Sequence, residues 1–93
     1  MIKYQPWIVC AACRAPDGFI AAGPRHFDNI MHRQIAAYAD ITVDVSYWEQ
    51  GFIDQRGKFY DRKRAMHIVL DNKQPFNLER NGNASILFSE GLY

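Results

Sequence analysis

The residues best suited to recognise a ligand lie together in the stretch GFIDQRGKFYDRKRA, at positions 51–65. Guanidinium groups bind phosphate oxygens through paired hydrogen bonds, and aromatic rings stack on nucleobases. Close interleaving of these side chains therefore favours a site for a phosphate-bearing ligand. The five basic and three aromatic residues concerned are Arg56, Lys58, Arg62, Lys63, Arg64, Phe52, Phe59 and Tyr60.

The same stretch also has a purely structural interpretation, as a solvated hairpin that leads into a helix. Asp61 is then only the N-cap of that helix, and composition alone favours this interpretation. Basic side chains in a first turn nevertheless oppose the helix dipole, because that end of a helix carries partial positive charge. Their presence indicates that the charge serves something other than helix stability.

A second basic cluster, Gly23-Pro24-Arg25-His26, lies between an expected strand and an expected helix. It is either another anion-binding helix start or a turn followed by a cap.

Enzymatic and metal sites have little support in the sequence. It contains no nucleophile elbow, Walker sequence, zinc-protease motif or glycine-rich dinucleotide loop. The spacing of the three histidines matches no common zinc pattern, so we expect neither a metal nor a cofactor. Cys10 and Cys13 lie in an expected strand, where positions three apart point to opposite faces, so we expect no redox pair. A nucleophile–base pair between Cys10 and a distant histidine stays open.

The totals indicate one small domain that spans residues 1–93. With a net charge of +1, bulk electrostatics do not favour a long nucleic acid as partner. We expect no membrane span, because there is no run of about 18 apolar residues, and we find no signal peptide. Aromatic residues make up 14% of the chain, a high share for so small a domain, and this predicts a homo-oligomer.

Turn residues and apolar spacing predict an α+β fold, with an antiparallel sheet and two helices in a single domain. We expect the tail at 89–93 to dock, with another subunit as the candidate surface. The predicted elements are a hairpin of strands 7–13 and 19–22, a helix at 27–39, a short strand or extended connection at 40–48, a hairpin of strands 51–54 and 58–60, a helix at 62–72, a polar loop at 77–85 and a last strand at 86–88.

Four pieces of the sequence together carry a resemblance to a known family. They are Gly23-x-Arg25-His26, Glu49-Gln50-Gly51-Phe52, Gly57-x-Phe59-x-Asp61-Arg62-x-x-Ala65 and Leu87-x-Ser89-Glu90-x-Leu92-Tyr93. Over most of its length the chain resembles the phage-encoded Thoeris anti-defence sponge proteins of the first described type. Members of that family are not enzymes. They sequester cyclic ADP-ribose-type signals made by bacterial TIR-domain proteins, such as glycocyclic ADP-ribose, and some also hold cyclic di- or trinucleotides at other sites.

The resemblance implies a partner, a location and a set of contact residues. The partner is a small cyclic nucleotide signal, bound without degradation in the cytoplasm of the infected bacterial host. The resemblance also implies dimers that associate into hexamers, with the signal pocket at a subunit interface. Phe52 is expected to stack under a base, and the other expected ligand-binding residues are Arg25, His26, Phe59, Asp61, Arg62 and Arg80. The chain departs from the family at 72–76 and in the polar stretch 79–85, where Arg80 lies.

Two alternative functions belong to other classes. One is a phage accessory protein that binds a host protein through an apolar surface. The other is a small nucleotide-acting enzyme that uses His26 or Cys10.

Overall fold

The computed structural model describes residues 4–38, 48–82 and 85–92. A four-stranded antiparallel sheet has the strand order β2-β1-β3-β4. The predicted α+β fold is confirmed, and two short helices accompany the two that were expected. The strands are β1 (Ile8–Arg14), β2 (Ile20–Gly23), β3 (Glu49–Asp54) and β4 (Phe59–Asp61), and the helices are α1 (Asn29–Tyr38), α2 (Arg62–Asp71), α3 (Leu78–Asn81) and α4 (Ser89–Leu92).

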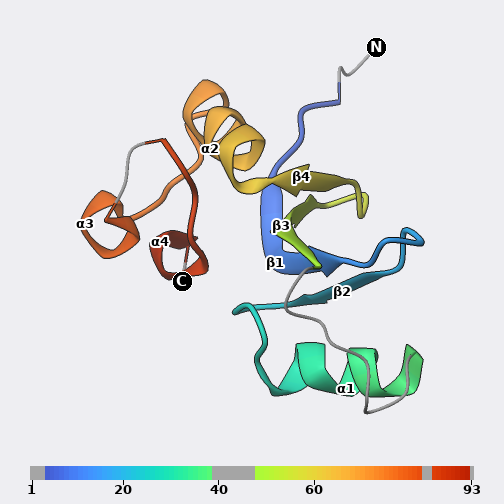
Figure 1. The fold of residues 1–93 in the computed structure, drawn as a ribbon. Coiled ribbons are helices and arrows are strands. Elements are labelled where there is room, and N and C mark those ends of the chain that lie inside the picture. Colours follow the sequence, from blue (N-terminus) through green and yellow to red (C-terminus); the bar gives the residue numbers. More distant parts are fainter. Residues whose placement is uncertain (1–3, 39–47, 83–84, 93) are drawn as a thin grey trace.

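The two long helices lie at opposite ends of the sheet (Figure 1). Helix α2 follows β4 directly and contacts β1, β3 and β4, whereas α1 contacts β2. The short helices α3 and α4 contact each other and lie together to one side of the sheet. None of the helices in the described part of the chain is long and apolar enough to cross a membrane.

One face of the sheet forms the hydrophobic core with α2. Residues paired across a ladder point to the same face, so Ala11, Phe52 and Tyr60 lie side by side, and all three are buried. Gln50 precedes Phe52 by two positions and therefore lies on this face too. Helix α2 contributes four buried side chains to the same core, Ala65, Met66, Ile68 and Val69.

Both predicted hairpins are confirmed. The first turns at Pro16-Asp17-Gly18, where Gly18 has a φ of +96°, which a glycine adopts without steric cost. The Asp17 side chain accepts a hydrogen bond from the Phe19 amide at 3.0 Å and so stabilises the turn.

A buried carboxylate organises the second hairpin. Asp54 is 1% exposed and accepts hydrogen bonds from the Arg56 amide at 2.8 Å, the Lys58 amide at 3.0 Å and the Tyr60 hydroxyl at 2.9 Å. The Tyr4 hydroxyl donates a fourth. Burial raises the pKa of this carboxyl, but the hydrogen bonds lower it by more, so its pKa lies below the ordinary value. Asp54 thus connects the hairpin to the N-terminal segment.

Side-chain caps set the starts of both long helices. Helix α2 begins at Arg62 as predicted, because Asp61 accepts a hydrogen bond from the Arg64 amide at 2.7 Å. Helix α1 begins at Asn29, two residues later than predicted. Phe27 has a φ of +58°, which is not helical, and Asp28 accepts a hydrogen bond from the Met31 amide at 2.9 Å.

The predicted strand at 86–88 is wrong. The backbone there bonds to a buried side chain in place of a neighbouring strand: Asn81 donates to the Ile86 carbonyl at 2.9 Å and accepts from the Phe88 amide at 2.7 Å. The expected polar loop at 77–85 contains α3, which Asn77 caps. The tail docks on the chain itself as α4, where the Gly91 carbonyl accepts from the Asn77 amide at 2.7 Å.

Two glutamines also take the place of missing strand neighbours. Gln34 of α1 bonds both the amide and the carbonyl of Ala22 on edge strand β2, at 2.8 and 2.6 Å. Gln74 bonds both backbone groups of Ile8 in the same way, at 2.9 and 2.7 Å. The segment predicted at 40–48 lies outside the described residues except for Trp48, which is buried.

We predict that Asp54→Asn lowers the free energy of unfolding at neutral pH by about 1.5–3 kcal/mol, since an amide offers one acceptor oxygen where a carboxylate offers two. The folded-state pKa of Asp54 is lowered, so its stabilising effect is present above the ordinary value of 3.8 and is lost as the pH falls through the folded-state value. Thermal unfolding of both proteins from neutral pH to about pH 3 tests this, and the variant should lose less stability on acidification.

Asp71→Asn is the matched control, because Asp71 is exposed at the end of α2. It should leave the unfolding temperature and its acid dependence nearly unchanged. Equal acid dependence in wild type and Asp54→Asn would show that Asp54 does not contribute in this way.

Candidate anion-binding site

Arg62, the first residue of α2, lies at the centre of a group of side chains from distant parts of the chain. Its Nη2 donates to Gln50 Oε1 at 2.6 Å, and its Nη1 donates to the Leu87 carbonyl at 3.1 Å. Its guanidinium also lies over the Phe88 ring, 4.8 Å from the centroid. Burial lowers the pKa of Arg62, but a guanidinium stays charged at neutral pH. Arg25, His26, Gln50, Arg62 and Phe88 form what we call the Arg62 cluster.

His26 is held neutral in this cluster. Its Nε2 lies 2.8 Å from the Gly51 carbonyl, which can only accept, so Nε2 carries the proton. Its Nδ1 is then an acceptor, and it faces Arg62 Nη2 in a longer contact of 3.5 Å. Burial, and after it the charge of Arg62, lowers the pKa of His26 below its ordinary value of 6.5.

Arg25 reaches the same C-terminal segment from the other side. Its Nη1 donates to the Ser89 carbonyl, two residues beyond the carbonyl that Arg62 holds. The Leu87 amide in turn donates to the Arg62 carbonyl at 3.1 Å. The structure thus brings Arg25, His26 and Arg62, which the motif resemblance groups as contact residues, close to the same segment, and both arginines bond to the backbone of residues 87–89.

The base-stacking role expected of Phe52 does not fit this structure. Phe52 is fully buried, and its ring meets His26 edge-on at a centroid distance of 5.3 Å. It supports His26 and has no open face for a base. The aromatic ring beside Arg62 is Phe88, which is only partly buried. Sequence reasoning missed Phe88, although it occupies the variable position of the Leu87-x-Ser89 motif.

The remaining predicted residues lie outside the cluster. Phe59 points to the opposite face of the sheet, where Arg14 covers its ring at 4.5 Å. Asp61 is exposed and caps α2. Arg80 is exposed on α3, and no hydrogen bond among the described residues connects its side chain to Arg62.

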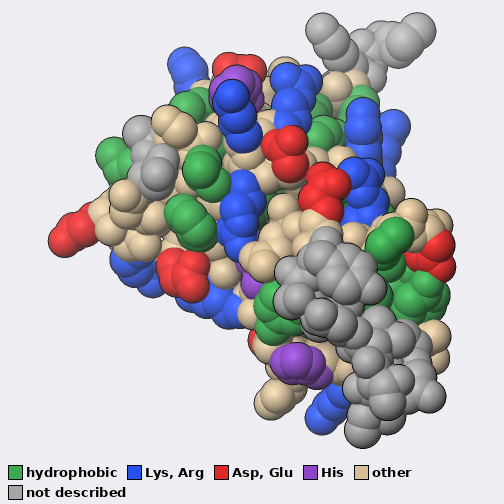
Figure 2. Space-filling view, viewed as in Figure 1, with side chains coloured by type: hydrophobic (Ala, Val, Ile, Leu, Met, Phe, Trp, Pro, Cys, Tyr) green, Lys and Arg blue, Asp and Glu red, His purple; other side chains and the backbone are tan. Residues whose placement is uncertain are grey.

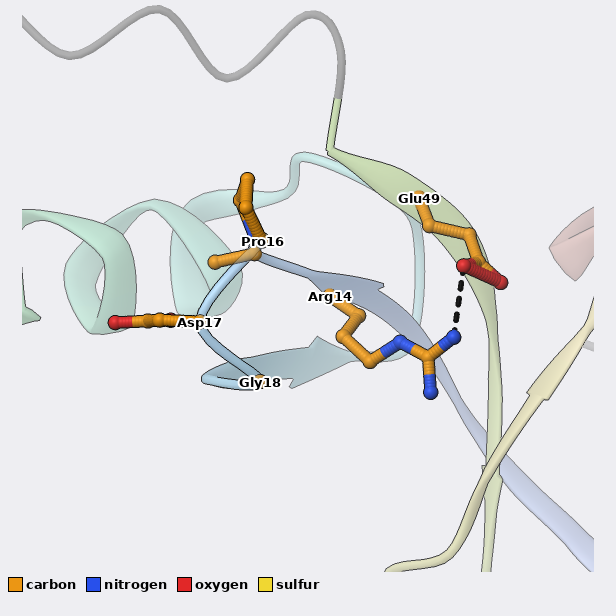
Figure 3. Close-up of a pocket in the computed structure, with 6 residues that line it drawn as sticks. Arg14, Pro16, Asp17, Gly18 and Glu49 are labelled. Carbon is orange, nitrogen blue, oxygen red and sulfur yellow. Dashed lines mark hydrogen bonds and ion pairs between the residues drawn. The ribbon is translucent and has the colours of Figure 1, made fainter.

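A hollow lies at the turn of the first hairpin, away from the Arg62 cluster (Figure 3). It has a volume of about 480 Å³ and is crossed by an ion pair of 2.8 Å between Arg14 and Glu49. Because Glu49 and Asp17 line it together with one arginine, it offers no net positive charge to an anion. On the face shown in Figure 2, Lys and Arg side chains are likewise interspersed with Asp and Glu.

Neither cysteine is an activated nucleophile. Burial raises the pKa of the Cys13 thiol to about 11, against the opposing effect of Arg62, and burial also raises the pKa of Cys10. Both thiols are free and stay protonated at neutral pH. Within the residues that the structure describes, no group of histidine, cysteine and acidic side chains could hold a metal ion.

We predict that Arg62→Lys loosens the C-terminal segment although it keeps the charge. A lysine is a point donor and cannot hold Gln50 and the Leu87 carbonyl from two ends of a planar group. The free energy of unfolding should fall by about 1–3 kcal/mol, and the amides of residues 87–88 should exchange faster with deuterium. Arg64→Lys, at an exposed position of the same helix, is the control. Equal exchange in the two variants would contradict a holding role for Arg62.

No curated protein and no solved structure matches this chain. A family model described as "Phage T4 y16D protein" matches residues 7–93, which is nearly the whole chain. This protein is therefore a member of the phage T4 y16D family.

Proposed function

We propose that the protein is a phage anti-defence sponge. It binds a cyclic ADP-ribose isomer made by bacterial TIR-domain proteins, such as glycocyclic ADP-ribose, and holds it intact in the cytoplasm of the infected host. Membership of a phage protein family and the resemblance of the four sequence motifs support this proposal.

The observation that carries the proposal is the Arg62 cluster. Two guanidinium groups, from Arg25 and Arg62, converge on one short segment beside the partly exposed ring of Phe88. Their partners there are backbone carbonyls, which are weaker acceptors than the oxygens of a phosphate. A ligand that carries phosphates and a base matches both the charge and the aromatic ring.

Binding without turnover is consistent with the state of the nearby groups. A general base needs a free lone pair near the substrate, but Nδ1 of His26 faces Arg62 and Nε2 is bonded to a carbonyl. The thiol of Cys13 is buried and protonated. These groups position the cluster and offer no activated nucleophile to a bound ligand.

We predict that the protein, incubated with glycocyclic ADP-ribose and separated from free ligand, releases the unchanged compound when it is heat-denatured. Mass spectrometry identifies what is released. The Arg25→Gln variant should retain at least about tenfold less glycocyclic ADP-ribose than wild type, because a charge-assisted hydrogen bond to phosphate is lost. Arg33→Gln, at an exposed position of α1, is the matched control and should retain as much as wild type. Circular dichroism confirms that both variants are folded.

The other outcomes of this experiment are equally informative. A new product in place of the intact signal would overturn the sponge in favour of the enzyme. No retained compound would overturn ligand sequestration and favour the host-protein partner.

We further propose that the protein acts as a homo-oligomer, a dimer that assembles into a hexamer. Among the described residues, five large apolar side chains are 41–54% exposed, which leaves apolar surface that a second copy can cover. They are Trp7, Ile30, Tyr38, Leu70 and Leu78.

Light scattering at micromolar concentration should give a mass that is a multiple of the 10.8 kDa chain. A uniform mass of 10.8 kDa would contradict the proposal.

A further inference from the structure

The partners that the described residues offer to the guanidinium of Arg62 are all electrically neutral. Its three hydrogen bonds go to a glutamine amide, a backbone carbonyl and a neutral histidine. The Phe88 ring lies under the guanidinium, and the thiol of Cys13 is nearby and protonated. No carboxylate of the described residues forms an ion pair with it. Among the described carboxylates, the exposed Glu90 acts on Arg62 at longer range, where its charge opposes the lowering of the pKa of Arg62 by burial.

An uncompensated charge in a half-buried position is unusual, because burial of a charge is costly unless an opposite charge accompanies it. Gln50 occupies the place where such a charge would be expected. Its Oε1 lies 2.6 Å from Nη2 of Arg62, closer than any other partner, and glutamate would put a carboxylate oxygen there with almost the same shape. The choice of amide over carboxylate keeps the positive charge of Arg62 available.

We infer that Gln50 determines the specificity of the Arg62 cluster: as a neutral partner it positions the guanidinium and leaves its charge to be satisfied by an anionic phosphate group of the ligand. This inference rests on the proposed function and adds a residue to it. Within the described part of the chain, these three hydrogen bonds use three of the five N–H groups of the Arg62 guanidinium. The other two N–H groups can bond to a ligand.

Gln50→Glu tests the inference, with inorganic pyrophosphate as the probe and calorimetry at low salt as the measurement. The variant keeps the acceptor oxygen but neutralises Arg62 and repels the anion, so affinity should fall about tenfold or more. Gln55→Glu is the charge-matched control. Gln55 lies on the same hairpin and is exposed, and its side chain bonds to Gln5 and Trp7 of the N-terminal segment. The affinity of this variant for pyrophosphate should stay within about twofold of wild type, because water weakens the Coulomb interaction of an exposed charge.

Glu90→Gln should change the affinity for pyrophosphate in the opposite direction. It removes the acid whose field reaches both Arg62 and His26, so pyrophosphate should bind about twofold to threefold more tightly. Glu90 is exposed, so this variant folds regardless of how Gln50→Glu behaves.

Thermal unfolding gives a second measurement on Gln50→Glu. Gln50→Glu should be at least as stable as wild type in the absence of ligand, since it supplies the missing counter-charge.

The outcomes separate this inference from the sponge proposal. A folded Gln50→Glu that binds pyrophosphate as tightly as wild type, or a wild type that binds none, would overturn the inference. If wild type binds pyrophosphate but retains no glycocyclic ADP-ribose, the sponge fails and the role of Gln50 stands. If Gln50→Glu retains that signal as well as wild type does, the sponge stands and the role of Gln50 fails.

Discussion

The contacts of one guanidinium connect three parts of this protein that lie far apart in the sequence. Arg62 starts α2, bonds to Gln50 on β3, meets His26 in the loop before α1 and holds the backbone at Leu87. A planar group with donors on several sides can make these contacts together, whereas an ammonium cannot. The position of Arg62 depends in turn on Asp61, whose cap fixes where α2 begins. The C-terminal segment then has a defined place on the core.

Neutral amide side chains have a second structural role in this small domain. Gln34, Gln74 and Asn81 each bond to backbone groups that no strand covers. A carboxamide offers one acceptor and two donors, so it can satisfy an amide and a carbonyl at once, as a neighbouring strand does. These side chains therefore satisfy backbone groups where a short strand ends and where the irregular C-terminal segment packs.

The proposed function assigns structure and recognition to the same residues of the Arg62 cluster. Its arginines hold the C-terminal segment through carbonyl oxygens, and a phosphate that binds there meets donors that are already oriented. In this proposal the neutral partners keep the charge available, and the fully buried Phe52 supports His26 from below. In the hollow at the first hairpin, by contrast, the arginine is already paired with Glu49. Charge balance distinguishes the two places.

Local chemistry determined what the sequence could predict by itself. The turns at Gly18 and Gly57 and the start of α2 at Asp61 depend on neighbouring residues, so both hairpins and that helix could be predicted. The grouping of Arg25, His26 and Arg62 came only from the resemblance of the motifs. Tertiary structure alone decided that Phe52 is buried, that Phe88 and Gln50 lie against Arg62, and that residues 86–88 form no strand. These outcomes depend on contacts such as the one between Arg25 and Ser89, 64 positions apart. No periodicity or turn signal encodes such pairs, because they form only once the sheet and α2 have packed.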